Sequence, residues 1–144
     1  MILTATSGHL KAVTQLTRSC LDEFKYTSQP FDYNIALDFI RKSMIYALSN
    51  VLVAEWDNKI VGFNIAFVIP YTFADGLRCN MESFYVLPQY RTEEHGLEKQ
   101  LLEHQIRWAQ KMGAKEIYGG DFNPAAFKST GFESIGLGFR KDII

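Results

Sequence analysis

One stretch in the second half of the chain limits the fold more than any other. Residues 81–114 read MESFYVLPQYRTEEHGLEKQLLEHQIRWAQKMGA: an apolar run ends at Pro88, and a polar turn with Arg91 and Gly96 leads into a helical pattern. A helix N-terminus leaves backbone N–H groups without intrahelical acceptors and carries partial positive charge. A strand, a turn and a helix in this order therefore predict a seat for a phosphate-bearing ligand at the turn.

Length and composition predict one packed domain over residues 1–144. Hydrophobic residues make up 47% of the chain and aromatic residues 14%, which is enough for a core and excludes a disordered chain. The formal net charge is -1, so the sequence predicts neither a nucleic-acid partner nor an anionic membrane partner. No apolar run is long enough to span a bilayer.

The first residues and the cysteines predict a cytoplasmic protein. The opening segment MILTATSGHLK lacks the basic and apolar regions of a signal peptide. Cys20 and Cys79 fall far apart, in an expected helix and an expected strand, and two buried thiols in a reducing compartment are the simplest explanation. His9 and His104 show no metal-ligand spacing with these cysteines, so no metal site is expected.

Changes of hydrophobic period and turn signals divide the chain into elements around one sheet. The Asp57-Asn58 pair between two β-rich runs indicates a hairpin. The expected strands are 2–6, 51–56, 59–70, 78–87 and 116–118, with a closing strand or pair of strands in 132–141, and the expected helices are about 8–23, 32–48, 94–112 and 123–129. The order β-α-α-β-β-β-α-β-α-β predicts a single mixed α/β domain.

Four local patterns in this order resemble the GNAT N-acetyltransferase superfamily. The family's hairpin, strand end, helix and C-terminal motif are matched by VLVAE at 51–55 with IVGF at 60–63, by FYVLPQYR at 84–91, by LL, WA and GA at 101–102, 108–109 and 113–114, and by NPAA at 123–126 with GFE at 131–133. The resemblance covers nearly the whole chain. It implies a GNAT-like fold with a central, mostly antiparallel sheet flanked by helices, and an opening between two strands that holds acetyl-CoA as co-substrate.

The resemblance also implies where the co-substrate binds. Backbone groups of the strand at Phe84, Tyr85 and Val86 would pair with the pantetheine arm. The turn from Arg91 to Glu98 would hold the pyrophosphate, through the amides of the residues that follow Arg91: Thr92, His95, Gly96, Leu97 and Glu98. Asn123 matches an asparagine that bonds the pantetheine in the family, although capping of its own helix is the favoured interpretation of this residue.

The turn departs from the family pattern R-x-x-G-x-G/A. Gly96 takes the place of the first glycine and Glu98 that of the second, and the turn is two residues longer than usual. Glu93, Glu94 and Glu98 suit a helix N-terminus without ligand but would repel a pyrophosphate unless they point away. For Arg91, phosphate binding and an ordinary solvated arginine are equally open, and His95 is interpreted as a solvent-exposed turn residue.

The sequence also departs from the family pattern at the residue that donates a proton. Many family members place a tyrosine four residues before the GF glycine to protonate the leaving thiolate, and Phe127 stands there. Tyr118 and Tyr85 are candidate substitutes. Glu82 is the candidate general base, because strict strand alternation would place it on one face with Asn80, Phe84 and Val86. A structural carboxylate paired with Arg78 or a lysine is nevertheless the favoured interpretation of this residue.

Two functions follow. The first is an N-acetyltransferase in which a primary amine of a small molecule or peptide attacks acetyl-CoA directly. The second is a non-catalytic GNAT-like binding module that has lost the co-substrate. The strand-end match and Asn123 favour the enzyme, whereas the acidic turn and Phe127 favour the module; of the two, the sequence favours the enzyme. The aromatic segment 24–33 would border the acceptor, and the apolar end at Ile143-Ile144 would permit a homodimer.

Overall fold

The strands of the central sheet lie side by side in the order in which they occur in the chain. The computed structural model describes residues 1–25, 27–120, 124–136 and 140–143. The sheet order is β1-β2-β3-β4-β5, with antiparallel pairing between the first four and parallel pairing between β4 and β5. The strands are β1 (Ile2–Thr4), β2 (Ser49–Trp56), β3 (Lys59–Pro70), β4 (Leu77–Val86) and β5 (Ala114–Tyr118).

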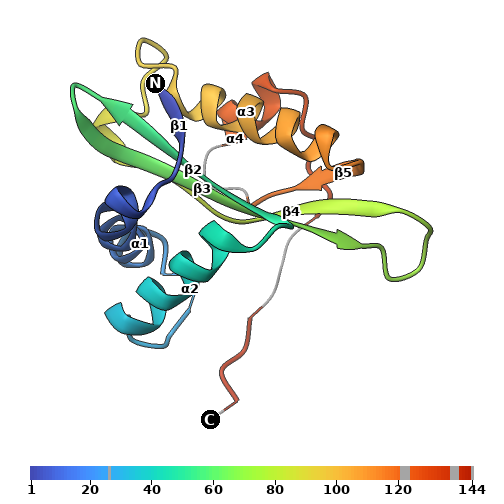
Figure 1. The fold of residues 1–144 in the computed structure, drawn as a ribbon, viewed down its shortest axis with the longest axis horizontal. Helices are drawn as coiled ribbons and strands as arrows, with labels where there is room; N and C mark the ends of the chain where they lie inside the picture. The colour runs from blue at the N-terminus through green and yellow to red at the C-terminus, as the bar shows by residue number, and fades with distance from the viewer. Residues whose placement is uncertain (26, 121–123, 137–139, 144) are drawn as a thin grey trace.

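Helices cover both faces of this sheet (Figure 1). One face carries α1 (Leu10–Phe24) and α2 (Tyr33–Ile45), and the other carries α3 (Leu97–Lys111) and the short α4 (Pro124–Ser129). Two 3-10 turns, Ser7–His9 and Pro88–Tyr90, precede α1 and follow β4. The predicted mixed α/β fold is confirmed, and each face of the sheet packs its own hydrophobic layer.

Local chemistry explains the turns and caps. Asp57 and Asn58 have φ of 52° and 62°, the backbone that a two-residue hairpin with the right twist requires. The Asp32 carboxylate accepts a hydrogen bond from the Ile35 N–H at 3.0 Å and caps α2. Gly96 has φ of 62° at the start of α3, so this helix begins three residues later than the predicted residue 94.

The C-terminal segment differs from the prediction. Residues 132–136 and 140–143 form neither helix nor strand, so the predicted closing strand is wrong for this described part, and 137–139 lie outside it. Of the apolar pair expected at an interface, Ile143 is exposed and Ile144 lies outside the described residues. None of the helices in the described ranges combines the length and apolar character that a bilayer span requires.

A bulge in β4 changes which side chains share a face. Ile65 pairs with Ser83, but the next residue of β3 pairs with Met81, so Glu82 is an extra residue in β4. On the sheet face that α3 covers, the core side chains of β4 on either side of the bulge are therefore Met81 and Phe84, which are three positions apart instead of the usual two. The predicted strict alternation, with Glu82 beside Phe84, is wrong because one inserted residue shifts every later side chain to the other face.

A buried polar network joins this bulge to α3. The Asn64 amide donates to the Ser83 carbonyl at 2.9 Å, and the Gln105 amide in turn donates to the Asn64 side-chain oxygen. Asn50 donates to the Gln105 side-chain oxygen at 2.7 Å. Asn64 and Gln105 are fully buried, so each hydrogen bond offsets the cost of removing an amide from water.

Candidate functional site

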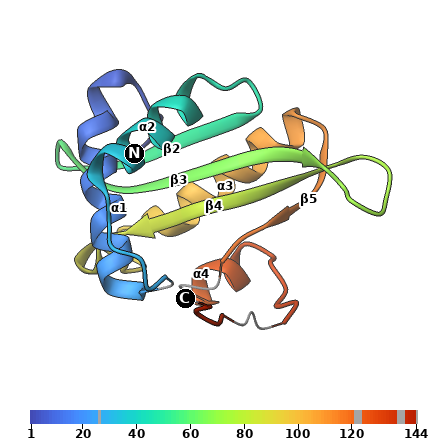
Figure 2. The same ribbon diagram turned by 90° about the horizontal axis from the view of Figure 1, so that it is seen from below.

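The strands β4 and β5 pair only over part of their length. The parallel ladder joins Leu77–Asn80 of β4 to β5, and the two strands diverge beyond it (Figure 2). The Leu87 N–H pairs with the Val61 carbonyl of β3 at 2.9 Å. Backbone groups of successive residues point to alternate sides along an antiparallel ladder. The N–H and C=O groups of Phe84 and Val86 therefore point away from β3, toward the side on which β5 no longer pairs with β4.

This edge of β4 is covered by its neighbours in the structure. Phe84 and Val86, backbone included, are only 3% and 1% exposed and belong to the core. Gly62 lies opposite Val86, and a Cβ there would approach the Tyr85 carbonyl and the Val86 side chain to 2.8 Å. The close packing fixes the position of the edge, and an extended chain with amide groups can pair with it only when the side chains that cover it move aside.

Arg91 does not lie over the predicted phosphate turn. Its guanidinium forms a two-pronged ion pair with Glu23 of α1, with N–O distances of 2.6 and 2.9 Å, and its Nε donates to the Val86 carbonyl at 2.6 Å. It also lies 5.4 Å from the ring centroid of Phe24 and 5.1 Å from that of Tyr85. The structure therefore places this arginine between α1 and β4.

The Arg91–Glu23 ion pair shifts the pKa values of the groups around it. The hydrogen bond from Arg91 is the main reason that the pKa of Glu23 lies below its ordinary value. Burial, followed by the hydrogen bond to Glu23, raises the pKa of Tyr85 to about 12. The Tyr85 hydroxyl donates to Glu23 at 3.0 Å on the α1 side of the sheet, so it does not point toward α4 and cannot replace the tyrosine missing there.

The predicted phosphate turn is closed by its own hydrogen bonds. The Thr92 carbonyl accepts from the N–H groups of His95 at 3.1 Å and Gly96 at 3.2 Å, and the Thr92 hydroxyl is bonded to the His95 ring. These two amides therefore have acceptors within the turn. A helix start leaves N–H groups without acceptors inside the helix, but Leu97 and Glu98, which begin α3, are only 1% and 7% exposed.

Two side chains near this helix start differ from the prediction. His95 is half-buried between Trp56 and Tyr90, with ring centroids 4.5 and 5.4 Å away, so it is not a solvent-exposed residue. Glu98 is only 7% exposed.

The pKa of Arg91 reflects its surroundings. Burial disfavours the charge of Arg91, but the bonds to Glu23 and the charges of Glu23, Tyr85 and Glu98 outweigh this effect and raise the arginine pKa.

The predicted acid and base lie away from the Val86 end of the edge. Glu82 is exposed at the bulge. Tyr118 pairs with Asn80, about 20 Å of extended strand before Val86. Its hydroxyl donates to Glu116 at 3.0 Å, a bond that raises the tyrosine pKa, and the guanidinium of Arg78 lies 5.4 Å from its ring centroid.

Phe127 fills the space where β4 and β5 part. It is 7% exposed, and its ring centroid lies 5.4 Å from that of Phe84 and 5.0 Å from that of Phe132. A Cβ on Gly119 would approach Met81 to 2.4 Å and Phe127 to 2.7 Å, so this glycine permits the close packing. Asn123, the predicted pantetheine contact, lies outside the described residues.

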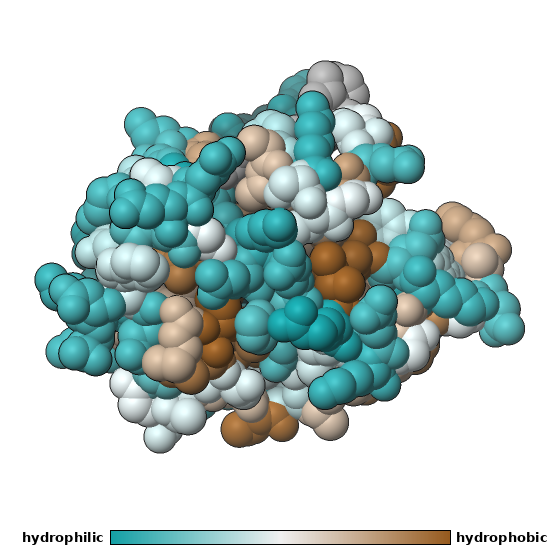
Figure 3. All heavy atoms as spheres, turned by 90° about the horizontal axis from the view of Figure 1, so that it is seen from above, coloured by the Kyte–Doolittle hydropathy of each residue, from teal (hydrophilic) through white to brown (hydrophobic). Residues whose placement is uncertain are grey.

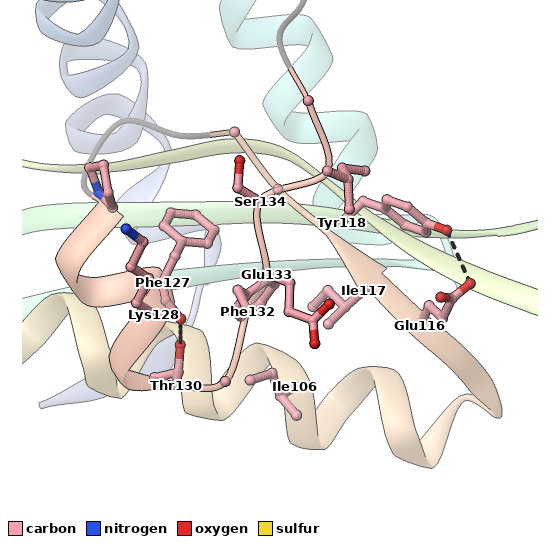
Figure 4. A pocket seen from close by; sticks show the side chains of 16 residues that line it. Ile106, Glu116, Ile117, Tyr118, Phe127, Lys128, Thr130, Phe132, Glu133 and Ser134 are labelled. Atoms are coloured by element: carbon pink, nitrogen blue, oxygen red, sulfur yellow. Dashed lines mark hydrogen bonds between the residues drawn. The ribbon is translucent and has the colours of Figure 1, made fainter.

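A cavity of about 680 Å³ lies on the other side of Phe127, between β5, α4 and the segment that follows (Figure 4). It includes neither Val86 nor the turn before α3. Its lining residues are Ile106, Glu116, Ile117, Tyr118, Gly119, Gly120, Pro124, Phe127, Lys128, Thr130, Gly131, Phe132, Glu133, Ser134, Ile135 and Gly136.

The outer surface on the α3 side of the molecule is mostly hydrophilic, with separate apolar patches (Figure 3).

Several residues of this region carry no sequence signal of their own. Glu23 follows Asp22 near the end of a helical pattern, 68 positions before Arg91, and only the fold brings Glu23 and Arg91 together. Trp56 ends a hairpin strand and meets His95 only in three dimensions. In the part of the chain that the structure describes, no three His, Cys, Asp or Glu side chains gather as a metal site would require.

Comparison with known proteins gives the following matches. A family model described as "Acetyltransferase (GNAT) family" matches residues 10–132. An integron cassette protein from the mobile metagenome of Cole Harbour Salt Marsh is similar in structure, with a TM-score of 0.82 and 17% identity over 99% of this chain and 90% of that chain. A comparison with curated proteins found no match.

Two further solved structures are similar over nearly their whole length. A predicted acetyltransferase with acetyl-CoA, from Clostridium acetobutylicum, has a TM-score of 0.81 and 13% identity over 99% of this chain and 96% of that chain. An aminoglycoside acetyltransferase, meta-AAC0020, from an uncultured soil metagenomic sample in complex with sisomicin, has a TM-score of 0.73 and 20% identity over 100% and 96%. At such identities the likeness shows the fold alone.

Proposed function

Because the chain belongs to the acetyltransferase (GNAT) family, we propose that it transfers the acetyl group of acetyl-CoA to a primary amine of a small molecule or peptide. The observation that carries this proposal is the edge of β4. Past Asn80 the strand has no partner among the described strands on its β5 side, and the backbone groups of Phe84 and Val86 face that side. A pantetheine arm, with its two amide groups, fits such an edge.

The fit is uneven along the co-substrate. The unpaired β4 edge suits the pantetheine arm, but Arg91 already occupies the Val86 carbonyl, and Phe84 and Val86 are buried, so Phe127 must move aside for the arm to bind. The pyrophosphate would rest on the first-turn amides of α3, since Arg91 is paired with Glu23 and two turn amides are bonded to Thr92. Glu98, buried at this helix start, opposes an anion there. We therefore expect weaker phosphate binding than an open glycine turn would give.

In the proposed reaction the neutral amine nitrogen forms a bond to the acetyl carbonyl carbon, and the carbon–sulfur bond breaks. The proton that the nitrogen loses goes to a water molecule or to Glu82, which is exposed at the bulge two residues before Phe84. The thiolate takes its proton from water. We assign no proton to Tyr118, because its hydroxyl is bonded to Glu116, nor to Tyr85, because its hydroxyl is bonded to Glu23.

The second candidate function is a GNAT-like module that binds no acetyl-CoA. The Arg91–Glu23 pair favours it, because the arginine at the family's phosphate turn serves to join α1 to β4 instead. Phe127 favours it as well, because its ring fills the space where the strands part.

Calorimetric titration of the full chain with acetyl-CoA and with CoA separates the two candidates. Binding in the micromolar range, lost on substitution of Leu97→Pro at the first α3 amide but kept in Gln110→Ala on the exposed far end of the helix, would support the enzyme. A variant that retains its unfolding transition is required for this comparison. No binding at millimolar co-substrate would exclude the proposed transfer.

A further inference from the structure

The pairing of β3 with β4 changes by one residue at the bulge. Ala66 faces Met81 before the bulge. Gly62 faces Val86 after it, whereas a ladder without the bulge would bring Gly62 opposite Tyr85. A slip of one residue turns every later side chain to the other face of the sheet and every later N–H to the other edge of the strand. The bulge therefore decides which backbone groups of β4 face β3.

Only the bulged register keeps the backbone of Phe84 and Val86 free of β3. The Leu87 N–H donates to the Val61 carbonyl of β3 at 2.9 Å, which fixes the alternation on this side of the bulge. The N–H and C=O groups of Phe84 and Val86 therefore point away from β3. In the unbulged register they would turn toward β3, and the backbone of Tyr85 would face the open side in their place. The edge available to a ligand would then shift by one residue relative to α3.

Asn64 bonds to β4 in a way that the unbulged register does not allow. It faces Phe84, and its amide donates to the carbonyl of the preceding residue, Ser83, at 2.9 Å. Without the bulge Ser83 itself would face Asn64, and the Ser83 carbonyl would move along the strand by about 3.3 Å, the rise of one residue. A hydrogen bond of normal length does not survive such a displacement. The bond therefore favours the bulged register.

Gln105 sets the direction in which the Asn64 amide points. The Nε2 atom of Gln105 donates to Oδ1 of Asn64, and its Oε1 atom accepts from Asn50 at 2.7 Å. Because the oxygen of the Asn64 amide accepts this bond, the NH₂ group is left to face Ser83. Asn64 and Gln105 are both 0% exposed, so water does not replace either partner. A turned Asn64 amide would set donor against donor at Gln105, which is why the network holds one orientation.

We propose that Asn64, oriented by Gln105, is a positioning residue that selects the bulged register of β4. Its side chain bonds to Ser83 and fixes which backbone groups of β4 the co-substrate meets. The packing of Phe84 against Phe127 belongs to the same register, so loss of Asn64 shifts the balance between two registers instead of unfolding the sheet. This inference rests on the proposed acetyl transfer for its role in binding, but the register can be measured without acetyl-CoA.

Cross-strand NOEs between Hα atoms report the register directly. In an antiparallel ladder, facing residues that exchange no backbone hydrogen bond have Cα atoms only about 4.5 Å apart, so their Hα atoms give strong NOEs. Gly62 and Val86 form such a pair after the bulge. Val68 and Cys79 form one before it, since the Val68 N–H bonds to the Leu48 carbonyl, away from β4.

The test measures these NOEs in the full chain and in Asn64→Leu. The substitution keeps a side chain branched at Cγ and removes its donor and its acceptor. We expect the NOE between Gly62 and Val86 to weaken and one between Gly62 and Tyr85 to appear. The pair before the bulge should keep its NOE, because the pairing there is the same in both registers.

A rescue and a control distinguish register selection from a general loss of stability. Deletion of Glu82 in the Asn64→Leu chain removes the extra residue, so a regular ladder brings Gly62 opposite Val86, and the original NOE should return. Val13→Ala truncates a fully buried side chain in the layer on the other face of the sheet. It lowers stability without touching the network, and it should keep the wild-type NOE.

Calorimetric titration with acetyl-CoA measures the consequence for the proposed site. We expect Asn64→Leu to bind about tenfold more weakly than the wild type, the value of one hydrogen bond to β4. Val13→Ala should bind as the wild type does. A shifted register with unchanged affinity overturns the positioning role.

The outcomes separate this inference from the proposed function. An unchanged NOE between Gly62 and Val86 in folded Asn64→Leu, or the same loss in Val13→Ala, overturns the inference even if acetyl-CoA binds. A register shift confined to Asn64→Leu, in a protein that binds no acetyl-CoA, supports the selection of register and overturns the acetyl transfer. Gln105→Leu carries the test if Asn64→Leu unfolds, because it frees the Asn64 amide to turn.

Discussion

The two terminal nitrogens of Arg91 bind the two carboxylate oxygens of Glu23, at 2.6 and 2.9 Å, across 68 positions of sequence. A third bond, from Nε to the Val86 carbonyl, fixes the same side chain to the end of β4. The three bonds tie α1 to the strand end and to the turn before α3. The arginine of the family's phosphate turn therefore has a structural role in this chain.

Removal of this arginine should lower stability more than it changes ligand binding. Arg91→Ala leaves the Glu23 carboxylate, whose side chain is 30% exposed, without its cation. We expect a loss of about 1–3 kcal/mol in the free energy of unfolding. Urea denaturation measures it, and Arg41→Ala, which breaks a 3.9 Å pair with more than half of each side chain exposed, should change it by less than about 0.5 kcal/mol. Equal effects of the two substitutions would contradict the structural role.

The same ion pair should make stability depend on pH on the acid side. The pKa of Glu23 is lowered from 4.5 in the folded protein, chiefly by the bond from Arg91. A depressed carboxyl pKa contributes stability that is present above pH 4.5 and is lost as pH falls through the folded-state value. The difference in unfolding free energy between the wild type and Glu23→Gln should therefore be constant from pH 7 to 5 and shrink below 4.5. A difference that stays constant down to pH 2.5 would exclude this contribution.

The sequence predicted those structural features that depend on residues close together in the chain. The Asp57-Asn58 hairpin and the helix that follows Gly96 depend on backbone preferences within a few residues, and both are present. The bulge at Glu82 was not predictable, because an inserted residue shows only against the partner strand. The same holds for the Glu23–Arg91 pair, whose members are neighbours only after α1 packs on β4.

Glu98 offers a direct test of where the pyrophosphate binds. Its carboxylate is buried in the first turn of α3 and would repel an anion on the amides there. Glu98→Gln keeps the shape and removes the charge, so acetyl-CoA should bind about tenfold more tightly at low salt, with a smaller gain at 0.5 M salt. Glu103→Gln, five residues further along the helix, is the matched control. Unchanged binding in Glu98→Gln would remove the first turn of α3 from the site.

The network below the bulge should be sensitive to loss of one amide. Gln105→Leu deletes the donor to Asn64 and the acceptor for Asn50, and leaves the buried amide of Asn64 and the half-buried amide of Asn50 without these partners. We expect the unfolding free energy to fall by about 2–4 kcal/mol, from one to two unmade buried hydrogen bonds. Gln110→Leu, on the exposed side of the same helix, should fall by less than about 0.5 kcal/mol. Comparable losses in the two variants would show that the network contributes nothing specific.

Phe127 permits a gain-of-function test of the missing proton donor. Its ring lies between the β4 edge at Phe84 and the cavity, and it occupies the position at which many family members carry a tyrosine. If acetyl transfer occurs and the thiolate takes its proton from water, Phe127→Tyr should raise kcat, by about tenfold or more, because a positioned acid replaces solvent. Phe132→Tyr adds the same hydroxyl to the ring that packs against Phe127, and it should leave kcat unchanged. The gain should fade as pH rises through the tyrosine pKa, since only the protonated phenol can donate. An equal gain in both variants would point to a general effect of polarity in the cavity, and no gain in either would show that proton donation to sulfur does not limit the rate.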